Sequence, residues 1–422
     1  MGKDFTVNPG VLRGVLRVPS SKSELLRAVL IGSVARGVTS FSAASLSGDV
    51  RAAIALVERC GADVQREANG NIKIRGGRWR QAQGLSAAES AFIFRTVPFM
   101  AAFQGLVGGI RREGTLRGRP QQELYGMMEA VGMLYTATDQ GVQFGYLLPK
   151  EPYDFRYSSL ESSQLLSGLL MASPLLGEEV RIGVERVPSG GYVELTLAVM
   201  SRYGVEVQRH ERGVYVVPAG DGYHAHGVEI GGDWSAASVF IAAAAYGGKI
   251  VLTNLQREAL QPDRAILDVL RRAGVHYHWD EGGALTVDGA NGRPKGFIYD
   301  ATDCPDLIPA LVLLASGAIG ESRIGGVSRL RGKECDRASA LEEGFSKLGG
   351  NVRVEGNELV VQGVESLRGG VDLSAYADHR MAMVLGAAGV LSQGGVKIEG
   401  GEAVRKSYPR FWEDLESVLC AK

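Results

Sequence analysis

The 422-residue sequence has only four cysteines, Cys60, Cys304, Cys335 and Cys420, and their spacing matches no metal-binding pattern. Scattered cysteines of this kind favour reduced thiols in a cytoplasmic protein over a disulfide framework. The net charge is also small, at −1, so no global field would attract nucleic acid or a membrane surface. An anionic ligand would have to be bound by local clusters of cations.

Long hydrophobic runs are absent as well. The longest, residues 239–246 and 307–315, fall short of the roughly 20 residues that a membrane span needs. No signal peptide is recognisable, because Lys3 and Asp4 lead into a strand-like segment. We therefore expect a cytoplasmic protein with neither a membrane nor a nucleic-acid partner.

What the sequence does contain is one pattern repeated six times, about every 70 residues. In each repeat a polar or charged turn opens a helix of small apolar residues, which closes at glycine before a short strand. Helix N-termini attract anions, so six of them are a functional clue. The six openings are Ser21-Lys22-Ser23, Glu89-Ser90, Ser162-Ser163-Gln164, Asp233-Trp234-Ser235, Cys304-Pro305-Asp306 and Asp378-His379-Arg380.

A second helix is expected in every repeat. The small residues of the first helices, for example residues 242–245, indicate that these helices are interior and covered by sheet. Short strands such as residues 205–207 and 351–354 would lie outside them. The second helices are expected to begin near Asp49, Pro120, Gly191, Pro262, Cys335 and Ser407.

The length of the chain predicts two domains of three repeats each. A polar, glycine-rich stretch at residues 220–232 indicates a boundary near residue 231. The strand-like segment 5–18 is expected to pair outside its own repeat, so residues 1–20 and 232–422 would form one domain and residues 21–231 the other. A cleft between two hinged domains is a usual place for a ligand.

Three of the six openings carry residues suited to substrate binding or catalysis. Ser21-Lys22-Ser23 followed by Arg27 brings hydroxyls and cations to one helix start, and Ser162-Ser163-Gln164 offers donors for a phosphate and a sugar-like hydroxyl. Asp306 at the fifth opening is a candidate general base. Helix capping explains each of these openings equally well when it is taken alone.

The later repeats add charge clusters at residues 331–337 and 378–383, and basic turns at 117–120 and 405–409. A solvated helix start is the ordinary explanation of such a run. Taken together, however, the cations outnumber the nearby carboxylates, which suits substrates with several negative charges. The pairs His224 and His226, and His276 and His278, have no third ligand nearby in sequence, so we assign no metal. Repeat four looks mainly structural.

With these motifs in order, the chain resembles the 5-enolpyruvylshikimate-3-phosphate synthase family. The resemblance runs from the strand before Pro19 to Pro409 and covers nearly the whole chain. Its fold is an α/β, two-domain inside-out barrel of six βαβαββ repeats, three per domain, which closes over ligand in the interdomain cleft. The motifs that carry the resemblance are Ser21-Lys22-Ser23 with Arg27, residues 116–120, Ser162-Ser163-Gln164, Lys333-Glu334 with Asp336-Arg337, residues 378–383, and Lys406-Ser407-Tyr408-Pro409.

The resemblance implies transfer of the enolpyruvyl group of phosphoenolpyruvate to the 5-hydroxyl of shikimate 3-phosphate, with release of phosphate. This step belongs to aromatic amino-acid biosynthesis and would need no metal or organic cofactor; we expect a monomer. The implied shikimate 3-phosphate ligands are Lys22, Ser23, Arg27, Ser162, Ser163, Gln164, Ser189, Tyr192, Asp306 and Lys333. The implied phosphoenolpyruvate ligands are Lys22, Arg119, Gln164, Arg337, Arg380 and Lys406.

For the chemistry, Asp306 is the expected base for the hydroxyl, and Glu334 and Lys22 are candidates for the other proton transfers. Two alternatives stay open. The enolpyruvyltransferase that acts on UDP-N-acetylglucosamine shares the fold but usually has a cysteine near residues 110–120, which this chain lacks. The chain could also be a noncatalytic anion-binding homologue.

The second repeat departs from the family pattern. Where the family usually has Gly-Asn-x-Gly-Thr, this chain has residues Ala-Ala-Glu-Ser at 87–90. We hypothesise that Glu89 pairs with Arg95 or a substrate-binding arginine, and reshapes the site for phosphoenolpyruvate and analogues such as glyphosate. Arg329 also stands where an amide is common, Gly190-Gly191 replaces Lys-Pro, and Glu24 follows Ser23.

Overall fold

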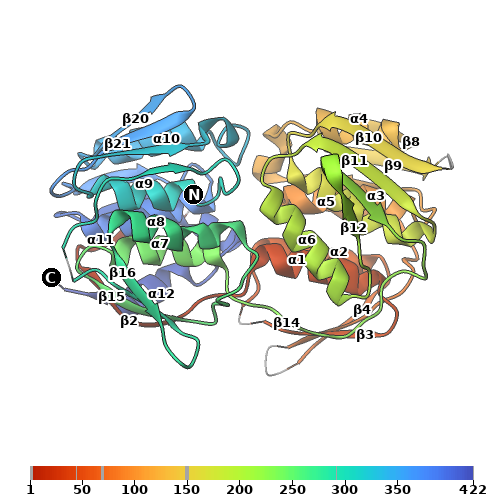
Figure 1. The fold of residues 1–422 in the computed structure, drawn as a ribbon, viewed down its shortest axis with the longest axis horizontal. Helices are drawn as coiled ribbons and strands as arrows, with labels where there is room; N and C mark the ends of the chain where they lie inside the picture. Colours follow the sequence, from red (N-terminus) through yellow and green to blue (C-terminus); the bar gives the residue numbers. More distant parts are fainter. Residues whose placement is uncertain (1–2, 44, 68–70, 148–151, 291, 422) are drawn as a thin grey trace. The chain divides into compact units, whose positions relative to one another are not determined.

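The computed structural model describes residues 3–43, 45–67, 71–147, 152–290 and 292–421, in two compact units (Figure 1). We call Lys22–Ile230 the central unit, and Met1–Ser21 with Gly231–Lys422 the terminal unit. The chain therefore passes from one unit to the other at Ser21 and again at Ile230. Each unit contains three of the sequence repeats.

The central unit alternates strands with helices. Repeat one has α1 (Lys22–Val34), β3 (Val38–Ser42), α2 (Gly48–Arg59), β4 (Asp63–Arg66) and β5 (Ile72–Arg75). Repeat two has β6 (Ala82–Ser86), α3 (Ala91–Ala102), β7 (Gly108–Arg111), the short 3₁₀ helix η1 (Gly114–Gly118), α4 (Gln122–Ala130), β8 (Met133–Thr138) and β9 (Gly141–Leu147). Repeat three has β10 (Tyr153–Ser159), α5 (Ser163–Ala172), η2 (Ser173–Leu176), β11 (Val180–Arg186), α6 (Gly190–Arg202), β12 (Gln208–His210), η3 (Glu211–Gly213), β13 (Val214–Val217) and the closing strand β14 (Gly227–Glu229).

The terminal unit follows the same plan. It begins with β1 (Phe5–Val7) and β2 (Val11–Arg17), and repeat four adds α7 (Trp234–Ala244), β15 (Lys249–Thr253), η4 (Pro262–Ala265), α8 (Ile266–Ala273), β16 (His276–Trp279) and β17 (Leu285–Asp288). Repeat five has β18 (Ile298–Asp300), α9 (Ile308–Ser316), β19 (Glu321–Gly325), η5 (Val327–Arg329), α10 (Arg337–Lys347), β20 (Asn351–Glu355) and β21 (Glu358–Gln362). Repeat six has β22 (Val371–Ser374), α11 (His379–Leu391), β23 (Val396–Glu399), η6 (Gly401–Lys406), α12 (Phe411–Val418) and β24 (Leu419–Cys420).

One strand order recurs in the sheets of the described chain. In β6-β7-β9-β8, β10-β11-β13-β12 and β18-β19-β21-β20, the first two strands are parallel and the others antiparallel. In two further sheets the strand that forms the parallel pair comes from a distant part of the chain. β14 pairs with β3 in one of them, and β2 pairs with β15 in the other. The expected pairing of the N-terminal segment outside its own repeat is thereby confirmed.

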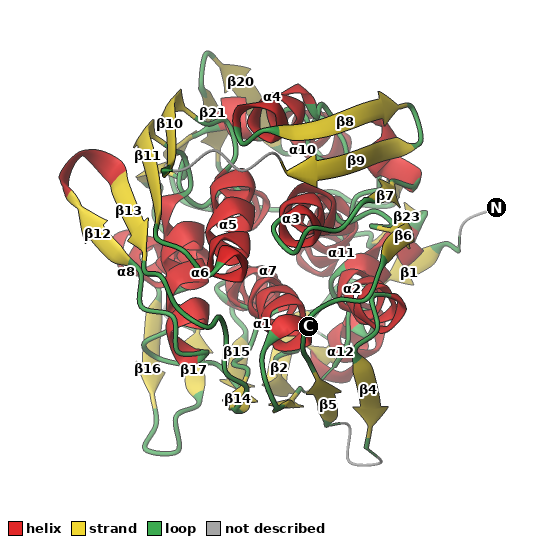
Figure 2. Cartoon of the chain, turned by 90° about the vertical axis from the view of Figure 1, so that its right-hand side faces the viewer, coloured by secondary structure: helices red, strands yellow, loops and turns green. Residues whose placement is uncertain are grey.

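The first helix of each repeat is buried almost all round, and the sheets lie outside it. Residues Ala242 to Ala245 at the end of α7 are at most 1% exposed. In the central unit, Figure 2 shows α3 and α5 side by side, with β8 and β9 on the outer side of α3 and β10 and β11 beside α5. A Cβ atom at Gly168 of α5 would lie 2.9 Å from the carbonyl oxygen of Arg95, so a residue without a side chain allows this close packing. The predicted inside-out arrangement is confirmed.

Two predicted strands differ from the structure. Segment 5–18 is not continuous but forms β1 and β2, which join separate sheets, and the break falls at Pro9, whose missing N–H cannot serve a ladder. The strand expected at residues 205–207 is also wrong. Val205 donates its N–H to the Met200 carbonyl and closes the end of α6, so the strand begins at Gln208. The helices in the described ranges are all too short or too polar to span a bilayer.

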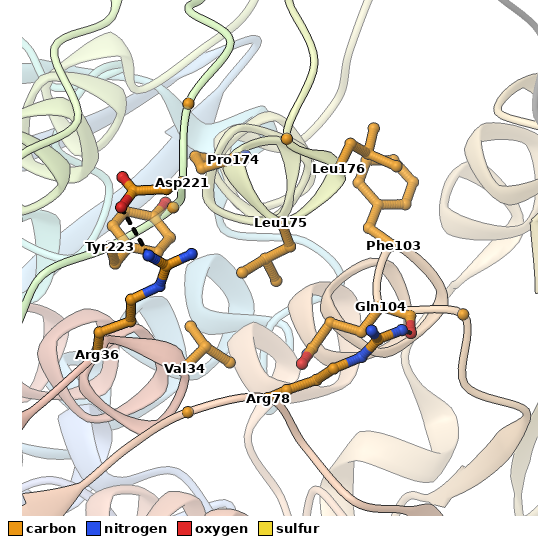
Figure 3. Close-up of a pocket in the computed structure, with 15 residues that line it drawn as sticks. Val34, Arg36, Arg78, Phe103, Gln104, Pro174, Leu175, Leu176, Asp221 and Tyr223 are labelled. Atoms are coloured by element: carbon orange, nitrogen blue, oxygen red, sulfur yellow. Dashed lines mark hydrogen bonds and ion pairs between the residues drawn. The ribbon is translucent and has the colours of Figure 1, made fainter.

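The central unit has a pocket of about 460 Å³ where α1, α3 and α5 end (Figure 3). Its apolar lining includes Val34 and Phe103. Two arginines at the pocket already have protein partners. Arg36 forms an ion pair with Asp221 at 2.7 Å, and Arg78 donates a hydrogen bond to the Gln104 carbonyl. Helix C-termini disfavour anions, and none of the predicted substrate ligands lines this pocket. The predicted anion sites therefore lie elsewhere, at the helix starts.

Candidate active site

In the central unit, Arg95 organises the polar side chains at the start of α5. Ser162 is the N-cap of α5, and its Oγ accepts a hydrogen bond from the Gln164 N–H at 3.3 Å. Arg95, about one turn into α3, donates to Ser162 Oγ and Gln164 Oε1, both at 3.1 Å. It also donates to Gln121 Oε1, just before α4, at 3.2 Å. Arg95 thus orients two side chains that were predicted to bind substrate.

Lys22 and Arg27 both lie on α1 but have different surroundings. Lys22 Nζ lies 3.1 Å from Asp49 Oδ2, and its side chain is 15% exposed. Arg27 is buried, and donates to Thr196 Oγ1 and to the carbonyl of Ser23, both at 2.8 Å. Burial lowers the pKa of Arg27 to about 10, so this arginine stays charged at neutral pH. It connects α1 with α6, while Lys22 remains within reach of solvent.

Ser189, Tyr192 and Arg119 are placed by the starts of neighbouring helices. Ser189 is buried just before α6 in a left-handed conformation, with φ +57°, and its carbonyl accepts the N–H of Tyr192 at 3.0 Å. A non-glycine residue with such a φ is often held for function. Arg119 is also buried and follows η1, and its carbonyl accepts a hydrogen bond from Arg112 at 3.2 Å. Ser163 is buried in the first turn of α5.

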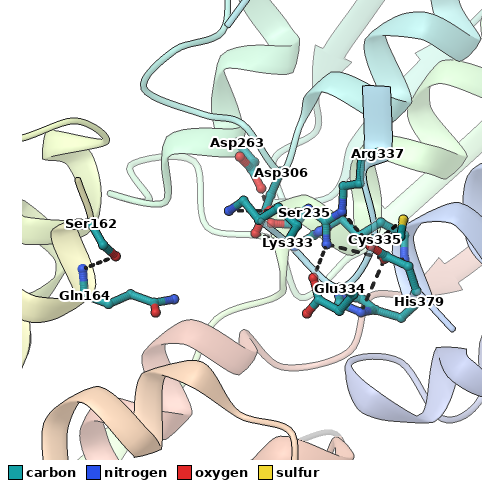
Figure 4. A network of polar contacts seen from close by, with 12 residues as sticks. Ser162, Gln164, Ser235, Asp263, Asp306, Lys333, Glu334, Cys335, Arg337 and His379 are labelled. Carbon is teal, nitrogen blue, oxygen red and sulfur yellow. Dashed lines mark hydrogen bonds and ion pairs between the residues drawn. The ribbon is translucent and has the colours of Figure 1, made fainter. Parts of the chain in front are cut away.

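In the terminal unit, Arg337 is the centre of a dense charge cluster (Figure 4). Its side chain is 2% exposed, at the first residue of α10. The guanidinium donates to Asp378 Oδ2 at 2.7 Å, and to Asp306 Oδ1 and Glu334 Oε2 at 2.8 Å each. Burial alone would lower the pKa of Arg337, but the attraction of these three carboxylates raises it. Arg337 is therefore a permanent cation that holds three carboxylates in place.

Asp306 and Glu334 each contact further cations. Asp306 Oδ2 accepts a hydrogen bond from Arg380 at 3.0 Å, and Lys333 Nζ lies 3.7 Å from Asp306 Oδ1. Glu334 Oε1 lies 2.9 Å from Lys406 Nζ. The Asp306 side chain is 25% exposed, whereas that of Glu334 is 6% exposed. Of these two carboxylates, Asp306 is the one that a substrate hydroxyl could reach more easily.

Repeat four, which was expected to be mainly structural, contains one buried carboxylate whose titration this cluster influences. Asp263, in η4, is 1% exposed and accepts a hydrogen bond from Ser235 Oγ at the start of α7. Burial raises the pKa of Asp263 to about 7; Arg380 opposes this rise and Asp306 adds to it. Asp263 follows Pro262 inside the first turn of η4, and it is not part of any of the six helix openings in the sequence.

We expect Asp263→Asn to change the pH dependence of stability. The Asp263 pKa is higher in the folded chain than the usual 3.9 of an unfolded one, so rising pH between about 4 and 7 favours unfolding. The free energy of unfolding of the variant should therefore rise relative to wild type by about 2 kcal/mol between pH 5 and pH 7. Denaturant unfolding at both pH values, followed by tryptophan fluorescence, measures this difference. If the difference in the free energy of unfolding between variant and wild type is the same at pH 5 and pH 7, the prediction is wrong.

The predicted residues thus lie partly in each unit, and in the terminal unit ion pairs join them into one group. No set of three or more His, Cys, Asp or Glu side chains in the described ranges is arranged to bind a metal ion. His224 instead lies 3.0 Å from Asp221. The terminal-unit group consists of Asp306, Lys333, Glu334, Arg337, Arg380 and Lys406. The predicted residues that lie in the central unit are Lys22, Ser23, Arg27, Arg119, Ser162, Ser163, Gln164, Ser189 and Tyr192.

Comparison with known sequences identifies the family. The family model of EPSP synthase (3-phosphoshikimate 1-carboxyvinyltransferase) matches residues 7–415, nearly the whole chain. The chain belongs to the EPSP synthase family. Among the relatives, the 3-phosphoshikimate 1-carboxyvinyltransferase of Clostridioides difficile is 31% identical over 423 residues, with 97% of this chain and 96% of the relative covered. That of Clostridium beijerinckii is 29% identical, with 98% and 97% covered.

A solved structure supports the fold of the EPSP synthase family. The EPSP synthase from Acinetobacter baumannii superposes with a TM-score of 0.81 at 21% identity, covering 99% of this chain and 98% of that one. At this identity the likeness concerns the fold alone. The two-domain inside-out α/β fold expected from the repeats is therefore confirmed.

The unusual loop of repeat two has a contact that the sequence did not suggest. Glu89 Oε1 accepts a hydrogen bond from the backbone N–H of Thr115, in η1, at 2.8 Å. Pairing of Glu89 with an arginine stays a prediction. Glu24, the other acidic departure from the EPSP synthase pattern, is buried and pairs with Arg202 across α1 and α6. Burial raises the pKa of Glu24, and Arg202 opposes the rise.

Proposed function

We propose that this chain transfers the enolpyruvyl group of phosphoenolpyruvate to the 5-hydroxyl of shikimate 3-phosphate and releases phosphate. The observation that carries the proposal is the Asp306 carboxylate, partly exposed and surrounded by Arg337, Arg380 and Lys333. A base next to fixed cations suits the deprotonation of a hydroxyl beside anionic groups. The names of the relatives and the membership of the EPSP synthase family support the same reaction.

The proposed binding roles are those that the resemblance to the EPSP synthase family implies. Shikimate 3-phosphate is assigned to Lys22, Ser23, Arg27, Ser162, Ser163, Gln164, Ser189, Tyr192, Asp306 and Lys333. Phosphoenolpyruvate is assigned to Lys22, Arg119, Gln164, Arg337, Arg380 and Lys406. We add Arg95 as a residue that orients Ser162 and Gln164, because it donates to both. The proposal includes a monomeric cytoplasmic enzyme that needs no metal or organic cofactor.

The reaction is an addition followed by an elimination. In the first step Asp306 takes the proton of the 5-hydroxyl, and the hydroxyl oxygen bonds to the central carbon of phosphoenolpyruvate. The methylene carbon of phosphoenolpyruvate gains a proton in the same step. In the second step the methyl carbon loses a proton, the double bond re-forms and phosphate leaves. Glu334 and Lys22 are the proposed groups for the proton transfers at carbon. The contacts of Glu334 with Lys406 and Arg337 would hold its carboxylate in a fixed direction.

Phosphate release with both substrates tests the proposal, with Lys22→Ala as the decisive variant. We expect kcat/KM to fall about 100-fold, because the variant loses charged hydrogen bonds to two anionic ligands. Lys73→Ala is the matched control, since Lys73 lies on the exposed face of β5 and pairs with Glu67. Its activity should match that of the wild type.

The same assay separates the alternatives. If folded wild-type protein releases no phosphate, the proposed reaction is wrong. Calorimetric binding of shikimate 3-phosphate without turnover would favour the noncatalytic homologue. Phosphate release only with UDP-N-acetylglucosamine as acceptor would favour the other enolpyruvyltransferase.

A further inference from the structure

The loop at residues 86–90 is joined by hydrogen bonds to the last residue of β7 and to the segment that follows it. The N–H of Ala87 donates to the carbonyl of Arg111 at 2.9 Å, and the N–H of Glu113 donates to the carbonyl of Ala88 at 2.8 Å. Ser86 Oγ donates to Glu113 Oε1 at 2.7 Å. These contacts bring the start of α3 against the start of η1, although the two are far apart in sequence.

Glu89 reaches across this junction with its carboxylate. Its Oε1 accepts the Thr115 N–H at 2.8 Å, in the first turn of η1. A hydrogen bond to a charged acceptor is stronger than a neutral one, and the N-terminal N–H groups of a helix favour an anion. A Cβ atom at Gly114, where φ is +48°, would lie 1.5 Å from Glu89 Oε1. The carboxylate therefore occupies space that only glycine leaves open.

The far end of the same short helix carries a predicted substrate ligand. Arg119 directly follows η1, and its N–H donates to the carbonyl of Leu116 at 3.2 Å. Leu116 directly follows Thr115, so its carbonyl joins Arg119 to the turn that Glu89 contacts. A shift at the N-terminus of this one-turn helix would be passed to the backbone of Arg119. The structure links Glu89 to Arg119 through four residues of backbone.

We propose that Glu89 is a positioning residue, which fixes η1 through Thr115 and thereby places Arg119 for phosphoenolpyruvate. This inference rests on the proposed function, because it takes Arg119 as a ligand of that substrate. It also explains how a negative charge is tolerated in a loop where the family usually has small and neutral residues. The Thr115 N–H donates a hydrogen bond to the carboxylate and so stabilises it. The role belongs chiefly to the carboxylate oxygen as a hydrogen-bond acceptor, and the negative charge strengthens the bond that it accepts.

Two substitutions at Glu89 separate these roles. Glu89→Ala removes the acceptor, and we expect the KM for phosphoenolpyruvate to rise about ten-fold, with kcat and the KM for shikimate 3-phosphate within about two-fold of wild type. Glu89→Gln keeps Oε1 as an acceptor and should restore a KM near that of the wild type. Gly114→Ala should repeat the effect of Glu89→Ala, and the double variant should be no worse than either one. Glu129→Ala, on the exposed face of α4, is the control for loss of a nearby glutamate.

Hydrogen exchange of peptides covering residues 113–119 tests the positioning without any substrate. We expect faster exchange in Glu89→Ala and wild-type exchange in Glu89→Gln and Glu129→Ala. If hydrogen exchange of residues 113–119 is the same in Glu89→Ala as in the wild type, the proposal is wrong, whatever the activity of the variant. A lower KM for phosphoenolpyruvate in both Glu89 variants would also overturn it, because the charge would then act only by repulsion. Lack of turnover by the wild type would refute the proposed function, and exchange would still decide whether Glu89 holds η1.

Discussion

Asp306→Asn is expected to lower kcat for phosphate release about 1,000-fold, within the range usual for loss of a general base. Asparagine has nearly the same shape but cannot accept the proton of the 5-hydroxyl. It also leaves Arg337, Arg380 and Lys333 in place, so the cations near an anionic substrate are retained. The KM for phosphoenolpyruvate should therefore not rise, and steady-state kinetics with both substrates would show the change almost entirely in kcat.

The matched control is Asp303→Asn, a few residues earlier in the same turn. Asp303 is exposed and has no place in the proposed site, so its kcat should stay within about two-fold of wild type. A single-turnover experiment would separate the chemical step from product release. An Asp306→Asn enzyme with near-normal kcat would remove Asp306 as the base and leave Glu334 as the next candidate.

The starts of the first helices could be predicted because their signals are local. Ser90, Ser162, Asp233 and Asp378 each accept an N–H of their own helix, which is the ordinary reason for such residues before an apolar run. Burial of these helices could also be predicted, because their apolar residues surround the whole helix. Strand ends were less certain, since Val205 has strand-like neighbours but completes the last turn of α6.

The contacts that organise the site could not be predicted, because they join distant positions. Arg95 is 67 residues from Ser162 and 69 from Gln164. Asp263 lies outside the six helix openings, and only the fold brings it close enough to Arg380 and Asp306 to interact with them. Sequence motifs identified which residues carry charge at the helix starts, but not which of those charges are buried. Arg337 is the clearest case, since its motif suggested a substrate ligand while its side chain is almost entirely enclosed.

That burial makes Arg337 the position where we expect the largest loss of stability. Arg337→Met would leave Asp378, Asp306 and Glu334 without their common cation, and two of these carboxylates are themselves buried. Removing one partner of a buried ion pair costs about 3–5 kcal/mol, and here Asp378, at 0% exposure, loses the guanidinium that neutralises it. We therefore expect the free energy of unfolding to fall by about 4 kcal/mol.

A surface arginine with the same number of carboxylate partners provides the control. Arg323 lies within 3.6 Å of Glu321, Glu355 and Glu358, but its side chain is 37% exposed. Arg323→Met should have little effect, because water and salt screen exposed charges. Denaturant unfolding of both variants, followed by the tryptophans, compares the two directly. Equal losses would show that the number of ion pairs matters rather than their burial, and would contradict the view that one enclosed guanidinium holds the terminal-unit cluster together.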